Sequence, residues 1–216
     1  MTRTVPLDRR QRRRAETIEQ VLDVAVEVMV DQGVAGLTLG EVARRMGIRP
    51  PSLYVYFDGK NALYDVLFER GWRELLAVLR VLYDQVRSQA PVDSFRTVSE
   101  VFVRWGVEHP AYAPLMFWRP VPGFTPSDAA YGPAIEIQGM ARAFLADMQR
   151  RGGVRADVDL DLAYRTWTTA TSGVLTQQLA NAPDEPFDTG TFTSTLPDVV
   201  AMWLTHYGPP RNRSSD

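Results

Sequence analysis

Cysteine is absent from the 216-residue sequence, and histidine occurs only twice, as His109 and His206. The absence of cysteine excludes disulfide bonds, a thiolate nucleophile and cysteine-ligated zinc. Two histidines offer little to a histidine-based metal site, so we expect no metal and no other cofactor. No segment approaches the roughly 18 consecutive apolar residues of a membrane span. Because the first residues are charged, they do not form the apolar stretch of a signal peptide, and we expect a cytoplasmic protein.

Lysine is equally scarce, since Lys60 is the only one beside 23 arginines. The net charge is -2, yet the charges are unevenly distributed. Residues 1–60 hold ten basic and eight acidic side chains, whereas the remainder holds 14 basic and 18 acidic ones. The positive surplus therefore lies in the N-terminal part, which suits an anionic partner, and the rest of the chain faces a different one.

The first periodic segment predicts a helix over residues 16–32. Its apolar side chains recur at spacings of three and four, and Gly33 follows where a helix usually stops. A second, shorter helix is predicted over residues 39–46, because Thr38 and Glu41 have the spacing of a capping box. In that motif the threonine hydroxyl accepts a hydrogen bond from the Glu41 amide, and the carboxylate reaches back to the threonine amide.

The segment GIRPPSLYVYFDGK, which follows directly, fits two structures. As a strand it would alternate cleanly, with Leu53, Val55 and Phe57 on the buried face. As a helix over residues 51–57 it would place Leu53 and Phe57 together, four residues apart. We favour the helix, because the paired prolines cannot donate to a sheet but suit the first turn of a helix. Two short helices joined by a glycine turn make a helix-turn-helix, whose second helix can enter the major groove of DNA.

Ten residues of this region, in an unbroken spacing, carry a family resemblance: Thr38, Val42, Ala43, Gly47, Ile48, Leu53, Tyr54, Phe57, Lys60 and Leu63. Over residues 17–67 the chain resembles the N-terminal signature of the TetR family of bacterial transcriptional regulators. The resemblance implies that Thr38, Tyr54 and Lys60 contact DNA phosphates, which fix the register of a protein on the duplex.

The segment also departs from the family pattern. Arg49, which we count as a DNA-binding candidate, stands where a serine often caps the third helix, and Gly40 replaces a residue that contacts bases in some members. Base reading would then fall to four residues of the third helix: Pro51, Ser52, Val55 and Tyr56. The arginines of residues 9–14 fit either an arm on the minor groove or backbone of DNA, or a mobile, solvated tail.

Beyond residue 60 the apolar period predicts six more helices, over residues 61–88, 92–108, 112–118, 127–151, 159–181 and 189–207. Gly71 would mark either a bend or a close helix crossing in the first of them. The segment TWTTATSGV resembles the effector domain of a TetR subgroup named for its tryptophan, histidine and glycine motif. Trp167 and Gly173 are present here, and Ser172 stands in place of the histidine.

Aromatic side chains gather in the middle of this second region. An aromatic stripe at helical spacing is often only core, but with polar neighbours such as Gln138, Arg119 and Thr168 it also fits a ligand pocket. We expect a largely apolar, planar ligand. Its candidate contacts are Trp105, Met116, Phe117, Trp118, Phe144, Tyr164, Trp167 and Thr171.

The last two helices carry more apolar residues than a monomer can bury, Trp203 among them. This surplus predicts a homodimer with a four-helix bundle at its interface. The expected architecture is all-α. It comprises a helix-turn-helix domain over residues 1–60 with an arginine-rich arm over residues 1–15, a helical effector-binding and dimerisation domain over residues 61–208, and a disordered tail over residues 209–216.

These patterns favour a repressor that an apolar aromatic small molecule releases from a pseudo-palindromic operator. A DNA-binding activator, or a structural DNA-binding protein without an effector, is the alternative. An enzyme is not expected. Asp157, Asp159 and Asp161 could suggest a cation site, but acidic residues before a helix more often mark its N-terminal turn.

Overall fold

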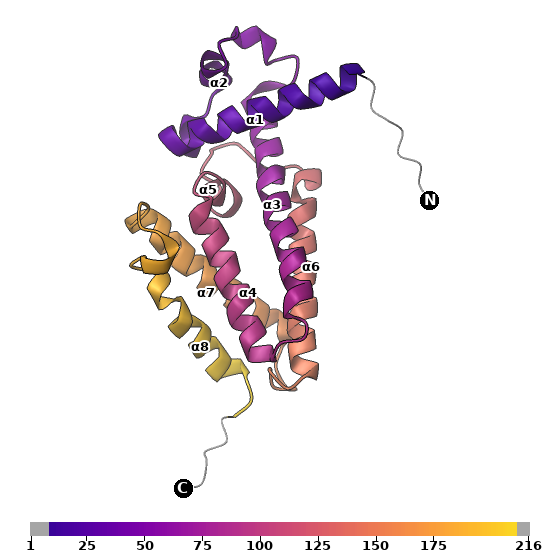
Figure 1. Ribbon diagram of the computed structural model, residues 1–216, viewed down its shortest axis with the longest axis vertical. Helices are drawn as coiled ribbons and strands as arrows, with labels where there is room; N and C mark the ends of the chain where they lie inside the picture. The colour runs from indigo at the N-terminus through magenta and orange to yellow at the C-terminus, as the bar shows by residue number, and fades with distance from the viewer. Residues whose placement is uncertain (1–8, 211–216) are drawn as a thin grey trace.

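The computed structural model describes residues 9–210, and within them the chain forms helices and turns but no strand. The elements are α1 (Arg9–Gly36), α2 (Leu39–Arg45), η1 (Pro50–Ser52), α3 (Gly59–Val86), α4 (Pro91–Glu108), α5 (Tyr112–Phe117), α6 (Asp128–Arg150), α7 (Leu160–Asn181), η2 (Phe187–Thr189), η3 (Thr193–Thr195) and α8 (Leu196–Tyr207). The all-α prediction is confirmed. Figure 1 shows α1 and α2 as a small unit across one end of α3, and a larger helical body around the rest of α3.

Helix α1 begins earlier than the sequence predicts. Residues 9–14 form its first turns, so they are neither an extended arm nor a mobile tail. Arginine, glutamine, alanine and glutamate are good helix formers, and nothing in this stretch interrupts them. Regular helix breaks at Gly33, whose φ of 71° suits glycine, as predicted. The rest of the expected arm, residues 1–8, and residues 211–216 of the expected tail lie outside the described residues.

The third helix is the main correction. Residues 50–52 form the 3₁₀ turn η1, and separate turns follow it, in which the amides of Tyr56 and Phe57 donate to the Leu53 carbonyl at 2.9 and 3.0 Å. Proline removes amide donors, and seven residues that include three aromatic side chains and the β-branched Val55 are too few to nucleate a stable α-helix. Leu53 and Phe57 are nevertheless both buried, which was the packing predicted for a helix.

Gly71 marks a close crossing and leaves α3 continuous. A Cβ atom built at Gly71 would lie 2.7 Å from Met116 Sδ and 2.9 Å from Tyr112 Cδ1. The absence of a side chain therefore lets α5 pack directly on the backbone of α3.

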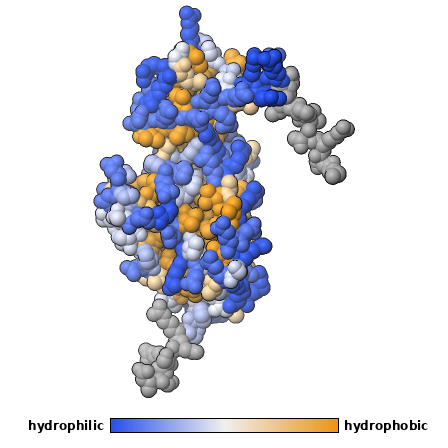
Figure 2. All heavy atoms as spheres, in the orientation of Figure 1, coloured by the Kyte–Doolittle hydropathy of each residue, from blue (hydrophilic) through white to orange (hydrophobic). Residues whose placement is uncertain are grey.

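In the helical body α3 packs along α6, α4 packs against α7, and α8 packs on both α4 and α7 (Figure 1). The ends of α3 to α7 lie within two residues of the predicted ones. Figure 2 shows hydrophobic residues reaching the surface of this body, framed by hydrophilic ones. No helix within residues 9–210 combines the length and the apolar character needed to cross a membrane.

Helix α8 is shorter than predicted, because it begins at Leu196 rather than at residue 189. The preceding residues form the turns η2 and η3. Their position is held by the buried Gln178 of α7, whose side-chain oxygen accepts the amides of Phe192 and Thr193 at 2.9 and 3.1 Å. A side-chain acceptor on another helix thus replaces the backbone bonds that a longer α8 would have made.

Trp203 is buried within a single chain, contrary to its expected place at a dimer interface. Only 4% of the residue is exposed. Its ring stacks on Phe95 with the centroids 4.2 Å apart, and its Nε1 donates to the Ala163 carbonyl at 3.0 Å. Trp203 therefore joins α8 to α4 and α7 of the same protomer.

Candidate nucleic-acid interface and ligand cavity

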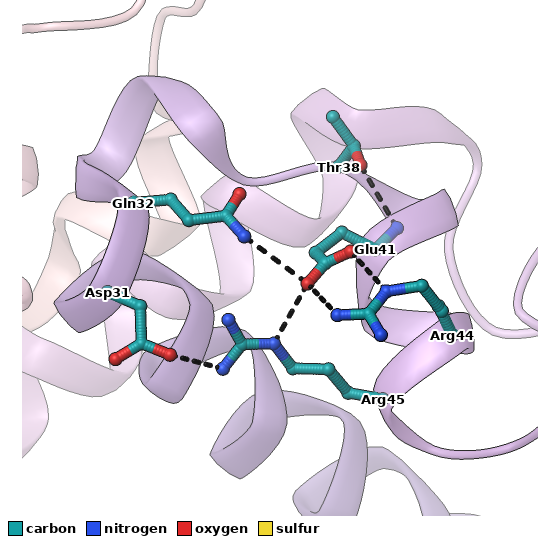
Figure 3. Close-up of polar contacts among 6 residues, drawn as sticks. All are labelled: Asp31, Gln32, Thr38, Glu41, Arg44 and Arg45. Atoms are coloured by element: carbon teal, nitrogen blue, oxygen red, sulfur yellow. Dashed lines mark hydrogen bonds and ion pairs between the residues drawn. The ribbon is translucent and has the colours of Figure 1, made fainter.

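Glu41 is the centre of a polar network that joins α2 to the end of α1 (Figure 3). Its carboxylate accepts bonds from Arg44 at 2.7 and 2.8 Å, from Arg45 Nε at 3.0 Å and from Gln32 Nε2 at 3.3 Å. Arg45 also pairs with Asp31 at 2.7 Å. The bonds from Arg44 and then Arg45 lower the pKa of Glu41 to about 2.

Half of the predicted capping box is present. Thr38 Oγ1 accepts the Glu41 amide at 3.1 Å and caps α2. The Glu41 carboxylate does not return to the Thr38 amide, because it is engaged by the two arginines instead. The cap fixes where α2 starts, and the network fixes where α2 lies against α1.

The DNA-binding candidates gather beside this network, and most of them face solvent. Tyr54 is 60% exposed and Val55 is 67% exposed, which is unusual for side chains of this size. The other exposed members of the set are Thr38, Arg49, Pro51 and Ser52. Tyr56 and Lys60 are half-buried.

Arg14 supports this surface, although the sequence did not single it out as a contact. Its Nη1 donates to the Val55 carbonyl at 3.2 Å, and its guanidinium lies 5.0 Å from the centre of the Tyr56 ring. The first turns of α1 are thereby attached to the turn at residues 50–57, and one face of Tyr56 is occupied. No local pattern reveals a contact between residues so far apart in sequence.

Lys60 is also engaged within the protein. Its Nζ donates to the Ala35 carbonyl at 3.4 Å and lies 5.1 Å from the centre of the Tyr64 ring. The Tyr64 hydroxyl donates to the Val34 carbonyl at 2.6 Å, and burial raises the pKa of this tyrosine to about 12. Together these two side chains attach the first turn of α3 to the chain that follows the break at Gly33.

A cavity of about 180 Å³ lies in the helical body. Its wall is formed by residues of α3, α4, α5, α6 and α7: Trp72, Leu79, Tyr83, Val98, Phe102, Phe117, Ala134, Ile137, Gln138, Ala141, Tyr164, Trp167, Thr168, Thr171 and Ser172. Among the predicted ligand contacts, Phe117, Tyr164, Trp167 and Thr171 line it. Ser172 lines it as well.

The other four predicted contacts lie elsewhere. Trp105 stacks on His109 with a centroid distance of 4.4 Å. Met116 packs at the Gly71 crossing, and Trp118 is 37% exposed and donates to Thr176 Oγ1 at 3.0 Å. Phe144 packs between Tyr83 and Trp167 without reaching the cavity. Residues that are neighbours in sequence point in different directions around a helix. Some aromatic residues of the cluster therefore line the cavity, and others pack in the hydrophobic core.

Sequence reasoning missed the contributions of α3 and α4, above all Trp72, Tyr83 and Phe102. Trp72 and Tyr83 lie on the partly buried side of α3, among the regularly spaced leucines of this helix. These two aromatic residues were the one signal in the sequence that α3 contributes to the cavity. Their role depends on which side of α3 faces α6 and α7, and that is a property of the packed body.

Some polar groups of the wall are already bonded. Trp167 Nε1 donates to Ser99 Oγ at 2.9 Å, and Thr171 Oγ1 donates to the Trp167 carbonyl at 2.9 Å. Thr168 Oγ1 donates to the Tyr164 carbonyl at 3.1 Å. Trp167 is thus fixed to α4, and its ring is a rigid part of the wall.

Asp159 caps the N-terminus of α7. Asp159 accepts the amides of Asp161 and Leu162 at 2.9 and 3.2 Å. Asp161 accepts a bond from Arg142 Nε at 2.9 Å, which lowers the pKa of Asp161. Within residues 9–210 no group of three or more acidic or histidine side chains is placed to hold a metal ion.

Comparison with known proteins places this geometry in a family. Residues 21–67, which span most of α1, all of α2 and the start of α3, match the family of bacterial regulatory proteins, tetR family. An HTH-type transcriptional regulator of Mycobacterium tuberculosis is 24% identical over 161 residues, which cover 74% of this chain and 69% of that protein.

Two solved structures share the fold along nearly their whole length. A Rhodococcus protein of unknown function has a TM-score of 0.73 at 19% identity, covering 89% of this chain and 95% of its own. The transcriptional regulator FadR of Bacillus subtilis, solved in complex with stearoyl-CoA, has a TM-score of 0.66 at 14% identity, covering 87% and 97%. With the family match over residues 21–67 and transcriptional regulators among its relatives, the N-terminal unit of the chain is similar to the DNA-binding domain of the tetR family of bacterial regulatory proteins.

Proposed function

We propose that the protein is a homodimeric repressor that leaves a pseudo-palindromic operator when a small molecule occupies the cavity in its helical body. Regulators of this family bind DNA, respond to small-molecule effectors and form dimers. The observation that carries the proposal is the helix α3, which starts beside the DNA-binding candidates and contributes Trp72, Leu79 and Tyr83 to the cavity wall. Such a protein acts in the cytoplasm and catalyses no reaction.

The proposed DNA-binding domain is residues 1–60, and its contacts are Thr38, Arg49, Pro51, Ser52, Tyr54, Val55, Tyr56 and Lys60. Hydroxyls and cations in this set suit phosphate oxygens. The exposed Val55 and Tyr54 suit apolar contact with base edges in the major groove. Lys60 can serve a phosphate only by giving up or sharing its bond to the Ala35 carbonyl.

The effector-binding and dimerisation domain is proposed to comprise residues 61–208, with α7 and α8 at the interface. Two large apolar side chains on these helices support that choice, because Leu162 is 49% exposed and Met202 is 65% exposed. A four-helix bundle formed by two copies would cover such side chains. The twofold axis would then present two identical DNA-binding units to the two halves of an operator.

Coupling between the cavity and DNA would run through α3. This helix has 28 residues and is about 42 Å long at 1.5 Å per residue. Its N-terminal half is held to α1 by Arg70, whose Nη2 donates to Asp23 at 2.7 Å. A ligand that displaces the wall at Trp72 or Tyr83 would therefore tilt α3 and change the separation of the two DNA-binding units, with a typical coupling of about 1–3 kcal/mol.

Nuclease protection tests the DNA-binding half of this proposal. Purified protein and fragments from its genomic neighbourhood should give a protected, pseudo-palindromic site. Val55→Ala should change which bases in that site matter. The control is Val81→Ala, because Val81 is 60% exposed on α3 in the body and should leave protection unchanged. Binding without any protected sequence, or equal effects of the two variants, would refute the assigned surface.

A further inference from the structure

The cavity wall is aromatic and carries no charge. Six of its side chains are aromatic: Trp72, Tyr83, Phe102, Phe117, Tyr164 and Trp167. No aspartate, glutamate, lysine or arginine lines it. Arg142 lies against the wall residue Tyr164, with its guanidinium 4.5 Å from the centre of the ring, but it is paired with Asp161. Transferring an ionised ligand into such a cavity would be strongly unfavourable, so the wall selects neutral compounds.

Several polar groups of this wall have no partner in the protein. Trp72 Nε1 is buried and makes no hydrogen bond within residues 9–210. In the same range, no hydrogen bond is made by the hydroxyls of Tyr83, Tyr164 or Ser172, whereas Trp167 Nε1 is bonded to Ser99. Buried donors without a partner are rare in native proteins and need an explanation, and Trp72 belongs to the cavity wall, so its Nε1 is a candidate donor to a ligand. Burial also raises the pKa of both tyrosines, so their hydroxyls stay protonated donors at neutral pH.

The size of the cavity limits the ligand further. At about 180 Å³ it is slightly larger than the roughly 150 Å³ cavity that accommodates benzene in another protein, and smaller than the roughly 300–1,000 Å³ typical of sites for drug-sized ligands. It therefore fits one six-membered ring with a small substituent. A long acyl chain such as that of stearoyl-CoA, the ligand of the FadR structure, does not fit.

We propose that the cavity binds a neutral, single-ring aromatic compound with a small oxygen acceptor, a carbonyl or an ether, and that Trp72 Nε1 or the Tyr83 hydroxyl donates to this oxygen. The inference rests on the proposed effector role of the cavity and narrows it to one chemical class. It replaces the broader sequence-based expectation of an apolar planar ligand, because the wall demands a hydrogen-bond acceptor as well as a flat ring.

Calorimetric titration of the full chain with four probes tests the class. Acetophenone has the proposed chemistry, ethylbenzene has nearly the same shape without an acceptor, benzoate is charged, and methyl stearate carries a long chain. Acetophenone should bind the wild-type protein about tenfold more tightly than ethylbenzene, the ratio expected for one hydrogen bond. Benzoate and methyl stearate should bind more weakly than either or not at all. Tightest binding by benzoate or by methyl stearate would overturn the proposal.

Two variants locate the donor. Trp72→Phe removes the indole nitrogen and Tyr83→Phe removes only the hydroxyl, and at least one should reduce the acetophenone to ethylbenzene ratio to about one. Because the two probes match in size, a cavity enlarged by Trp72→Phe alters both affinities together and leaves the ratio alone. An unchanged ratio in both variants, each folded by circular dichroism, would overturn the proposed bonds. The control is Trp118→Phe, which changes a tryptophan outside the cavity and should preserve the ratio.

Operator release, measured separately, distinguishes this inference from the proposed function. A probe that binds with the expected ratio without releasing DNA supports the ligand class and contradicts the effector role. Conversely, operator release by a compound of another class, with acetophenone silent, contradicts the ligand class while the effector role stands.

Discussion

Single residues in the N-terminal unit divide into those that face solvent and those that hold the exposed ones in place. Arg14 and Glu41 belong to the second group, because their partners are the Val55 carbonyl and the arginines of α2. Residues of this kind are not recognisable in a sequence, since their partners follow from packing. They should be separable from direct contacts by the salt dependence of DNA binding.

Arg14→Ala provides that separation. The variant loses its bond to Val55 and its contact with the Tyr56 ring, so operator affinity should fall several-fold through a displaced turn. If Arg14 only positions the turn, the slope of log affinity against log salt concentration should stay constant. A lost phosphate contact would reduce its magnitude by about 0.9 for each phosphate. Arg10→Ala, which removes an equal charge from the same helix, is the control, and fluorescence anisotropy at several salt concentrations measures both variants.

Glu41 should make the N-terminal unit sensitive to acid. Its folded-state pKa is lowered to about 2 from an ordinary value of 4.5, so its contribution to stability is present above about pH 4.5 and is lost as the pH falls towards 2. Glu41→Gln should therefore melt at a lower temperature than wild type at pH 7, with the difference shrinking below pH 4.5. A difference in melting temperature that stays constant from pH 7 to pH 2.5 would contradict this role for the carboxylate.

At the scale of elements, the sequence predicts most helices, misplaces the starts of α1 and α8, and assigns a helix where residues 50–57 form turns. The ends of α3 to α7 follow from apolar periodicity and from glycine and proline positions, which are local signals. For residues 50–57 the sequence correctly predicts that Leu53 and Phe57 are buried. It wrongly predicts an α-helix where the chain forms turns. Two buried residues that lie four positions apart can belong to a helix or to two consecutive turns. Over only seven residues, apolar periodicity therefore cannot distinguish a helix from turns.

The crossing at Gly71 gives a test of helix packing against helix propensity. Gly71→Ala gains about 1 kcal/mol of propensity, but its methyl group would meet Met116 and Tyr112 at less than 3 Å. Overpacking of this kind costs about 1–3 kcal/mol, so the variant should be destabilised or nearly neutral.

Gly139→Ala is the matched control, because nothing lies within 4 Å of a Cβ atom at that position of α6. It should stabilise the protein by about 0.5–1 kcal/mol. Urea denaturation compares the two variants. Equal stabilisation by both would show that α5 does not press on α3 at Gly71.

At the scale of the whole molecule, the candidate ligand site could be predicted only in part. Phe117, Tyr164, Trp167 and Thr171 were identified because aromatic and hydroxyl residues cluster in α5 and α7. Trp72 and the rest of the opposite wall could not be, since the wall consists of the inward sides of helices brought together by the fold. Which aromatic residue lines a cavity and which fills the core is decided by the rotation of each helix about its axis.

Dimerisation through α7 and α8 is testable at two neighbouring positions of α8. Met202→Glu places a charge on an exposed side chain of the proposed interface, where pairing would desolvate it, and should give folded monomers with weak operator binding. Trp203→Ala instead removes a buried ring and should cost about 3–5 kcal/mol of folding free energy. Analytical ultracentrifugation and thermal melting measure the two effects. A Met202→Glu protein that remains dimeric would move the interface away from this face.

If the cavity binds an effector as proposed, the position of Tyr83 has a consequence for how fast that effector enters. Its ring lines the 180 Å³ cavity and also a larger hollow beyond it, which Arg80, Arg87, Arg150 and Arg151 border. If a ligand entered from that hollow, the ring of Tyr83, which lies 5.2 Å from that of Phe144 between centroids, would have to rotate aside first. Association would then level off at high ligand concentration instead of rising in proportion. Under the proposed effector role, the delay between the appearance of a ligand and the release of DNA would then depend on the rotation of the Tyr83 and Phe144 rings and not on the final affinity.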